Sequence, residues 1–141
     1  MRKFKIYAAG AMAGLKTEVA NAWRIKASHL LYETGYPIMV VNPVNFYNFD
    51  VDPTAYTERE VMDFDLYQVR DSDLILVNLD FPNSIGTAIE MFYAHDILKI
   101  PVVAFGKMQN HPWIQCCTNK HCETLEEAVE YIKDFYLVVH R

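Results

Sequence analysis

Short apolar runs alternate with amphipathic segments along the whole chain. An unbroken apolar run is typical of a strand covered on both faces, and an apolar stripe at helical spacing is typical of a surface helix. On this pattern strands are expected at residues 5–9, 37–41, 74–79 and 101–105, with a weaker fifth strand at 114–118. Helices fill the intervals, so that strand and helix follow each other in turn.

Helix boundaries are marked by residues that cap or end helices. Thr17 is expected to cap a helix that ends at Gly35, because Thr favours N-caps and Gly favours C-terminal ends. Thr57-Glu58-Arg59-Glu60 is a capping-box pattern that opens a helix to about Arg70, and Thr124-Leu125-Glu126-Glu127 is a second one. The apolar face of this last helix contains Leu125, Ala128, Val129, Ile132 and Phe135.

Alternating strands and helices predict an α/β fold with a parallel sheet and right-handed crossovers. We expect residues 1–141 to form a single domain with three layers, a doubly wound sheet of four to five strands in the flavodoxin-like arrangement. Ligands in such folds bind outside the carboxyl ends of the strands. The candidate ligand loops are therefore residues 10–14, 42–52, 80–90 and 106–113.

Composition and charge exclude several classes of protein. The 141 residues are 52% hydrophobic and 22% charged, as in a globular domain, and the net charge is −5 without any basic run. We therefore expect no nucleic-acid polymer as a partner, since phosphate backbones are bound by clustered Lys and Arg. No apolar stretch approaches the roughly 20 residues that span a bilayer, and no signal peptide is recognisable. The expected location is the cytoplasm, without contact with a membrane.

The cysteines are few and irregularly placed. Cys116, Cys117 and Cys122 are an odd number, which does not describe a disulfide framework. His111 and His121 lie nearby, which makes zinc an alternative, but adjacent cysteines lack the spacer that zinc-binding loops use. Free thiols are the better interpretation, and no metal site is expected.

Glu90 lies in the most apolar helix pattern of the chain. The surrounding residues are Ile85, Ala88, Ile89, Met91, Phe92 and Ala94. A helix that is apolar all round is expected to be buried, and an unpaired buried charge is costly. Glu90 therefore has either a hidden partner or a function; a salt bridge to Arg24 or Lys99 and an exposed helix face are the other interpretations.

Asp65 is the second candidate among the carboxylates, because it lies between apolar neighbours on the preceding helix. Two carboxylates at one pocket suit glycosidic chemistry, with one as nucleophile and the other as acid. The loop after the first strand, from Gly10 to Gly14, could bring backbone amides to a ligand. Its glycine spacing is neither a dinucleotide fingerprint nor a P-loop, and a tight structural turn explains it equally well.

Three segments together resemble the nucleoside 2-deoxyribosyltransferases and the related 2'-deoxynucleoside 5'-phosphate N-hydrolases. They are Lys5-Ile6-Tyr7-Ala8-Ala9-Gly10, Asp65-Leu66-Tyr67-Gln68-Val69 with Asp71-Ser72-Asp73-Leu74, and Gly86-Thr87-Ala88-Ile89-Glu90 with Ala94. The resemblance extends from Lys5 to about Phe105. It implies an enzyme without a cofactor that cleaves the N-glycosidic bond of a nucleoside or a nucleoside 5'-monophosphate.

The resemblance also implies roles for individual residues. Glu90 would be the nucleophile that forms a glycosyl-enzyme, Asp65 would manage the proton of the departing base, and Tyr7 would orient Glu90. Water or a second nucleobase would then resolve the intermediate. The substrate-binding residues would be Gly10, Asn42, Ser84 and Gly86.

Ser84 departs from the transferase pattern, which has an Asp at this position. The nucleotide hydrolases have a Ser-x-Gly pattern like Ser84-Ile85-Gly86 and use the serine near the phosphate, so Ser84 favours a 5'-monophosphate; it can equally be an ordinary N-cap. The loop from Gly10 to Gly14 lacks the serine and arginine of the hydrolases. Residues 138–141 do not match the transferase tail that completes a neighbouring subunit's site.

Two further features concern the surroundings of the pocket. The aromatic segment 46–49 could stack on a nucleobase or pack as core. The apolar excess of the helix that carries Glu90 predicts a homodimer or a larger homo-oligomer. A nucleotide-binding or sensing module of the same fold, without turnover, is the alternative function.

Overall fold

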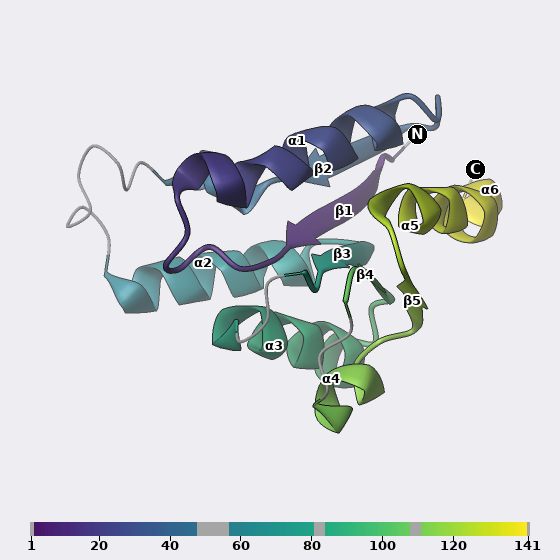
Figure 1. Cartoon of the computed structure of the whole chain (residues 1–141). Coiled ribbons are helices and arrows are strands. Elements are labelled where there is room, and N and C mark those ends of the chain that lie inside the picture. The colour runs from purple at the N-terminus through teal and green to yellow at the C-terminus, as the bar shows by residue number, and fades with distance from the viewer. Residues whose placement is uncertain (1, 48–56, 81–83, 108–110, 141) are drawn as a thin grey trace.

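All strands of the sheet run parallel in the order β2-β1-β3-β4-β5 (Figure 1). The computed structural model describes residues 2–47, 57–80, 84–107 and 111–140. The strands are β1 (Phe4–Ala9), β2 (Ile38–Val41), β3 (Leu74–Asn78), β4 (Val102–Phe105) and β5 (Lys120–Cys122). The flavodoxin-like α/β fold that the sequence predicts is confirmed.

The strands are added to the sheet on opposite sides of β1: β2 on one side, and β3, β4 and β5 on the other. β2 pairs with one edge of β1 and β3 with the other, so that Tyr7 lies opposite Val41 on one side and Ile75 on the other. The loops that leave β1 and β3 at their carboxyl ends therefore diverge from neighbouring points. This is the switch point at which sheets of this class bind ligands.

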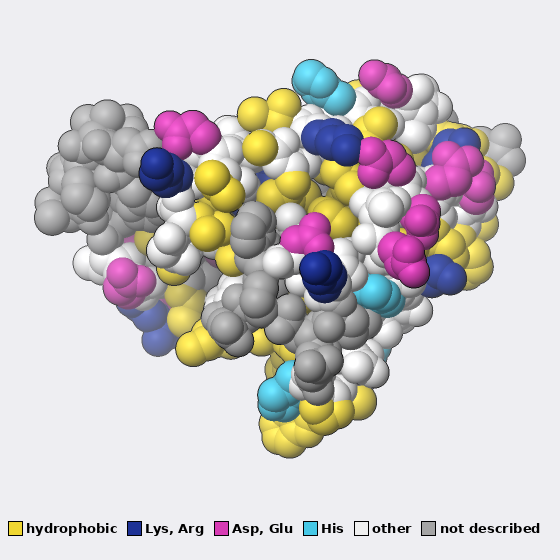
Figure 2. Space-filling model, viewed as in Figure 1, with side chains coloured by type: hydrophobic (Ala, Val, Ile, Leu, Met, Phe, Trp, Pro, Cys, Tyr) yellow, Lys and Arg dark blue, Asp and Glu magenta, His cyan; other side chains and the backbone are white. Residues whose placement is uncertain are grey.

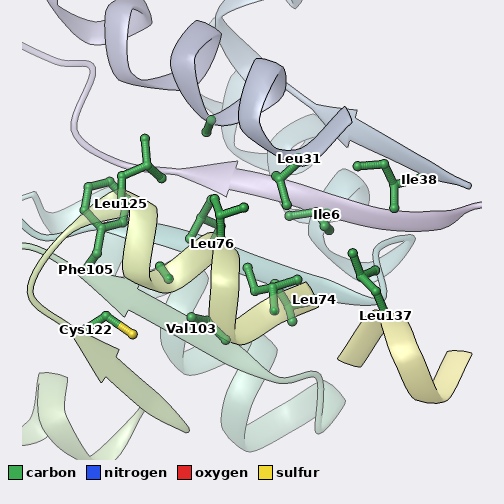
Figure 3. Close-up of a cluster of buried hydrophobic side chains, with 14 of the residues drawn as sticks. Ile6, Leu31, Ile38, Leu74, Leu76, Val103, Phe105, Cys122, Leu125 and Leu137 are labelled. Atoms are coloured by element: carbon green, nitrogen blue, oxygen red, sulfur yellow. The ribbon is translucent and has the colours of Figure 1, made fainter. Parts of the chain in front are cut away.

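One face of the sheet is covered by α1 (Thr17–Tyr32) and α5 (Leu125–Tyr131). Their inward side chains meet those of the strands in a continuous cluster, which Figure 3 shows with Leu31 and Leu125 from the helices above Ile6, Leu76 and others from the sheet. Residues of η3 (Ile132–Leu137) extend this cluster, and the short α6 (Val138–His140) follows.

The other face is covered by α2 (Glu58–Arg70), α3 (Ile85–Phe92) and the π-helical turn η2 (Tyr93–Leu98), with α4 (Pro112–Cys116) beside them. Val69, Met91 and Ala94 supply the buried contacts with the strands. The 3-10 turn η1 (Pro43–Phe46) follows β2. The sheet is thus apolar on both faces, as the continuous apolar runs predict.

Most predicted caps are present. Thr57 and Glu60 form the reciprocal capping box of α2, and the Thr124 side chain accepts the Glu127 N–H at the start of α5. The prediction for Thr17 is wrong: Lys16 is the N-cap of α1 and makes no side-chain cap, while Thr17 is the first helical residue. Helix α1 ends at Tyr32, shortly before Gly35, whose φ of +81° suits glycine.

The predicted fifth strand at residues 114–118 is wrong. Pro112 occupies the first turn of α4 and the His111 ring accepts the Trp113 N–H, so this segment begins as a helix, and β5 forms later at Lys120–Cys122. The apolar face of the last helix is confirmed except for Phe135, which is exposed and stacks on Tyr131.

The expectation that the Glu90 helix is buried all round is also wrong for the single chain. Ile85, Ile89 and Phe92 lie at i, i+4 and i+7 of α3 and are 77%, 43% and 51% exposed. This spacing places them on one stripe of the helix. Only the opposite side, with Thr87 and Met91, packs into the fold.

Charges of both signs are interspersed over the face in Figure 2, without a basic patch. Within the described residues, no helix is both long and apolar enough to cross a membrane.

Candidate active site

A pocket of about 1160 Å³ lies at the carboxyl end of β1. Its wall is formed by the turn after β1, the inner side of α1, the η1 turn, α2 and the first turns of α3. Among the residues predicted from sequence, Tyr7, Gly10, Asp65, Ser84, Gly86 and Glu90 all line it. The fold therefore brings together side chains that are as far as 83 positions apart in the sequence.

Tyr7 and Glu90 form the first polar pair of the pocket. Tyr7 is fully buried, and its hydroxyl donates a 2.6 Å hydrogen bond to Oε2 of Glu90. Burial raises the pKa of Tyr7, so its hydroxyl remains protonated and acts as a donor. A 2.6 Å O–H···O distance lies in the range of charge-assisted bonds to carboxylates. Glu90 therefore has a partner, and that partner is a hydroxyl group.

Tyr47 and Asp65 form a second pair of the same kind. The Tyr47 hydroxyl, at the end of the η1 turn, donates a 2.9 Å hydrogen bond to Oδ1 of Asp65 on α2. Sequence reasoning considered Tyr47 only for base stacking or core packing. Tyr47 lies in one of the predicted ligand loops, and this position was the only sign in the sequence that it could reach the pocket. No sequence motif indicates that its side chain points towards Asp65.

Arg24 lies at the same pocket and its side chain is fully buried. Its Nε donates to the Ala8 carbonyl at 3.1 Å and its Nη2 to the Gly10 carbonyl at 3.0 Å, while Nη1 donates to the carbonyl of Ala20. In the described part of the chain, neither Arg24 nor Lys99 forms an ion pair with Glu90 or Asp65. The salt-bridge interpretation of Glu90 is thus wrong.

Burial raises the pKa values of both carboxyl groups. The pKa of Glu90 is raised to about 7, chiefly by desolvation; the Tyr7 hydrogen bond opposes this rise, the Asp65 charge adds to it and the Arg24 charge opposes it. The pKa of Asp65 is raised to about 6 by desolvation, against the Tyr47 hydrogen bond and the Arg24 charge. Both groups therefore hold their protons to a higher pH than free carboxyl groups do, and the charge of Asp65 adds to this effect at Glu90.

Ser84 caps the helix that carries Glu90. Its hydroxyl oxygen accepts the Thr87 N–H at 3.2 Å, and its hydroxyl group donates to Thr87 Oγ1 at 2.7 Å. The N-cap use that the sequence allowed is therefore present. Gly86 follows in the first turn of α3 and is exposed to the pocket.

Gly10 allows close packing at the floor of the pocket. A Cβ atom at this position would lie 2.9 Å from the Trp23 ring, so that only glycine fits without a shift. Asn42 is not among the pocket-lining residues that the structure describes. Its Nδ2 donates to Oδ1 of Asn21, which does line the pocket, and its Oδ1 accepts the Val44 N–H of η1.

The other candidates lie away from the pocket or form its edge. Phe46 packs on Phe64 at 5.1 Å between ring centroids, which favours the packing interpretation; residues 48 and 49 of the aromatic segment lie outside the described residues. Residues 138–140 form α6, and Arg141 is outside the described residues as well.

The three cysteines are free thiols, and His121 contacts the Gly106 carbonyl at 2.7 Å. Within the described ranges, no three His, Cys, Asp or Glu side chains are grouped so that they could hold a metal ion.

The chain was compared with protein-family models, with curated protein sequences and with solved structures. A family model described as "Domain of unknown function (DUF4406)" matches residues 4–104. No curated protein sequence matches the chain with significance.

Three solved structures are similar in fold. A conserved protein from Enterococcus faecalis V583 has a TM-score of 0.74 at 20% identity, covering 94% of this chain and 99% of its own. A 2-deoxyribosyltransferase from Bacillus psychrosaccharolyticus has a TM-score of 0.64 at 22% identity, with 90% and 91% covered. The CMP N-glycosidase BcmB from Clostridium botulinum has a TM-score of 0.56 at 14% identity, with 93% and 99% covered. The chain therefore shares its fold with a nucleoside transferase and a nucleotide glycosidase.

Proposed function

The chain belongs to the DUF4406 family, and we propose that this member cleaves the N-glycosidic bond of a nucleoside through a covalent glycosyl-Glu90 intermediate. The observation that carries the proposal is the pair of tyrosine–carboxylate contacts, Tyr7 with Glu90 and Tyr47 with Asp65, at one pocket. Two carboxyl groups with pKa values near neutral pH can supply a nucleophile and an acid at the same pH. The fold shared with a 2-deoxyribosyltransferase and a CMP N-glycosidase supports the same chemistry.

The first step makes one bond and breaks another. The ionised Glu90 carboxylate attacks the anomeric carbon, and the electron pair of the C–N bond leaves with the base, which takes the proton of Asp65. Tyr7 binds one oxygen of Glu90, Oε2, and leaves the other for attack. Tyr7 is thus a positioning residue for the nucleophile.

The second step reverses the proton transfer. Water, or the nitrogen of a second base, attacks the anomeric carbon, the ester to Glu90 breaks, and Asp65 takes up the proton that the attacking group loses. Activity requires that the single proton of the pair lie on Asp65 while Glu90 is ionised. Because the pKa of Glu90, about 7, lies above that of Asp65, about 6, this is the less populated of the two singly protonated forms. The rate should therefore rise and fall around the pKa values of about 6 and about 7, with an optimum between them.

The charges of the pocket favour a substrate without a phosphate group. Arg24 is the one Lys or Arg among the described lining residues, and its N–H groups already bind backbone carbonyls. Ser84 donates its hydroxyl hydrogen to Thr87. Residues 48–56 and 81–83 contain no Lys or Arg. A dianionic phosphate would therefore enter a pocket that already holds Asp65 and Glu90.

The proposal is tested by incubating the protein with each nucleoside and each 5'-monophosphate, with and without a free base, and measuring released or exchanged base by chromatography. Release from nucleosides that is lost in Glu90→Gln is expected, with a glycosyl adduct on the wild-type protein by intact mass spectrometry. Glu58→Gln is the matched control, because Glu58 also lines the pocket but is exposed. Release that is unchanged in Glu90→Gln would contradict the nucleophile; tight binding without any release would favour the sensing module.

We also propose that the chain forms a homodimer or a larger homo-oligomer through α3. The exposed stripe of Ile85, Ile89 and Phe92 supports this proposal, since large apolar patches at a surface mark interfaces. Ile85 and Ile89 line the pocket as well, so an interface on this stripe would border the site.

A further inference from the structure

Arg24 is a buried cation, and among the described residues no carboxylate forms an ion pair with it. It is 0% exposed, and its N–H groups are directed at the carbonyl oxygens of Ala8, Gly10 and Ala20. Arginine is rarely fully buried unless it is paired with an acidic side chain, because desolvation of a charge is costly. Arg24 therefore brings a positive charge to the wall of the pocket that also holds Asp65 and Glu90.

The contacts of Arg24 lie along the backbone that carries Tyr7. Ala8 follows Tyr7 directly, and Gly10 begins the turn at the pocket floor. The guanidinium lies over the Trp23 ring, 4.8 Å from its centroid, and 3.4 Å from the position that a Cβ of Gly10 would occupy. The Arg24 guanidinium is therefore held by the Trp23 ring and by the carbonyls of Ala8 and Gly10. The same hydrogen bonds hold the end of β1 in place.

The charge of Arg24 acts on a defined set of groups. Those around the pocket are Tyr7 from β1, Tyr47 after η1, Glu58 and Asp65 from α2, and Glu90 from α3. The Arg24 charge lowers the pKa values of both Asp65 and Glu90 against the effect of burial. A positive charge that favours the ionised form of both carboxyl groups moves the titration of the pair as a whole.

We propose that Arg24 is a positioning residue that holds the end of β1, and with it Tyr7, and brings a buried positive charge to the pocket that contains Glu90 and Asp65. Its consequence for the rate rests on the proposed function. Its effect on the carboxyl groups does not, and can be measured in a protein without any substrate.

The direct test is a carbon-13 NMR titration of the side-chain carboxyl groups in the wild type, Arg24→Gln and Arg24→Lys, with Glu90→Gln and Asp65→Asn for assignment. Arg24→Gln keeps N–H donors but removes the charge, and the midpoints of Glu90 and Asp65 are expected to rise by about 1 pH unit. Arg24→Lys keeps the charge, and midpoints within roughly 0.3 pH unit of the wild type are expected. Lys26→Met removes an exposed cation from the same helix and should leave both midpoints unchanged.

The rate gives a readout that a merely structural role would not produce. A shift of the whole profile by about 1 pH unit makes base release by Arg24→Gln about fivefold slower than wild type at pH 6 and several-fold faster at pH 8. A structural defect would lower the rate at both pH values.

Unchanged midpoints in a folded Arg24→Gln variant would overturn the inference. If that variant does not fold, Arg24→Lys decides, since midpoints raised by about 1 pH unit despite the retained charge would overturn it equally. A wild type that releases no base from any nucleoside would refute the proposed function, while the NMR titration would still test the role of Arg24.

Discussion

At Glu90 the surroundings act on one carboxyl group in opposite directions. Desolvation and the Asp65 charge favour the protonated acid, whereas the Tyr7 hydroxyl and the Arg24 charge favour the carboxylate. The outcome is a pKa of about 7 in place of the ordinary value of 4.5. Glu90 can therefore exist in either form near neutral pH, at a cost to the folded state when it is ionised.

That cost makes Glu90→Gln a stabilising substitution above neutral pH. Because the folded-state pKa is raised, the folded protein keeps a proton that the unfolded chain releases, and the free energy of unfolding falls as the pH rises from about 4.5 to about 7. Glutamine cannot ionise but can still accept from Tyr7. We expect a gain of about 1–3 kcal/mol at pH 8 and roughly none below pH 4.5.

Urea unfolding at both pH values measures this gain, with Glu58→Gln as the control on the exposed side of the pocket. An equal effect of Glu90→Gln at pH 4.5 and pH 8 would contradict the assigned cause.

Tyr47 allows a second prediction at the same scale. Tyr47→Phe removes the 2.9 Å hydrogen bond to Asp65 and keeps the ring. The pKa of Asp65 should then rise, because this bond holds it down. Asp65 then keeps the proton that the departing base needs to a higher pH, so base release at pH 8 should be about three- to tenfold faster than in the wild type, with a change of no more than about twofold at pH 6. The measurement is the pH profile of base release, and Tyr67→Phe, an exposed tyrosine on the same helix as Asp65, is expected to behave as the wild type. Identical profiles for Tyr47→Phe and the wild type would contradict a role for this hydroxyl.

Of these two residues, the sequence allowed the role of Glu90 to be predicted but not that of Tyr47. A lone carboxylate within an apolar helix pattern is visible in one dimension, so that Glu90 could be predicted. The Tyr47 ring meets the Phe64 ring of α2 edge to face, 6.3 Å between centroids, and this contact joins two elements that the sequence separates. No local signal encodes such a contact.

At the scale of elements, α3 depends on its first residue. The Ser84 side chain binds the Thr87 N–H, which is otherwise without a partner at a helix start. Ser84→Ala should lower the free energy of unfolding by about 1 kcal/mol, and Ser84→Asp, which retains a cap, by a few tenths at most. Chemical denaturation checks both values.

Substrate preference shows whether the Ser84 hydroxyl only caps α3 or also contacts a substrate phosphate. Since Ser84 acts on α3 in our interpretation, Ser84→Ala should change the KM for a nucleoside and for its 5'-monophosphate by the same factor. A loss of affinity for the monophosphate alone would assign the hydroxyl to a phosphate site.

Secondary structure was predictable where cap chemistry and apolar pattern agreed, as at Thr57 and Thr124. It was not predictable where they competed. Residues 114–118 include Ile114 and Thr118, which favour strands, but Pro112 and the His111 cap begin a helix just before them. The strand forms only after that helix has ended.

At the scale of the whole molecule, the exposed stripe of α3 predicts self-association. Phe92→Glu places a charge on this stripe without touching the described pocket lining, and it should shift a wild-type dimer or larger oligomer towards the monomer. Light scattering coupled to size-exclusion chromatography measures the change, with Val139→Glu on α6 as a matched control. A wild type that stays monomeric at all concentrations would contradict the interface.

The topology was predictable from the alternation of elements, because right-handed crossovers leave few arrangements for such a chain. For the pocket, only the loops that could form it were predictable from the sequence. Its wall comes from α1, α2 and α3 at once, and their relative placement follows from packing against the sheet.

The position of Tyr7 between two paired strands has a consequence for local motion. Its backbone is enclosed by β2 and β3, so its amide proton can exchange with solvent only when the sheet itself opens. Asp65 lies on a peripheral helix whose first turn is exposed, and such elements open at lower free energy. The hydrogen-bond partner of Glu90, the Tyr7 hydroxyl, is thus held by the centre of the sheet, whereas Asp65 and its partner Tyr47 depend on a helix and a turn that are expected to open at lower free energy.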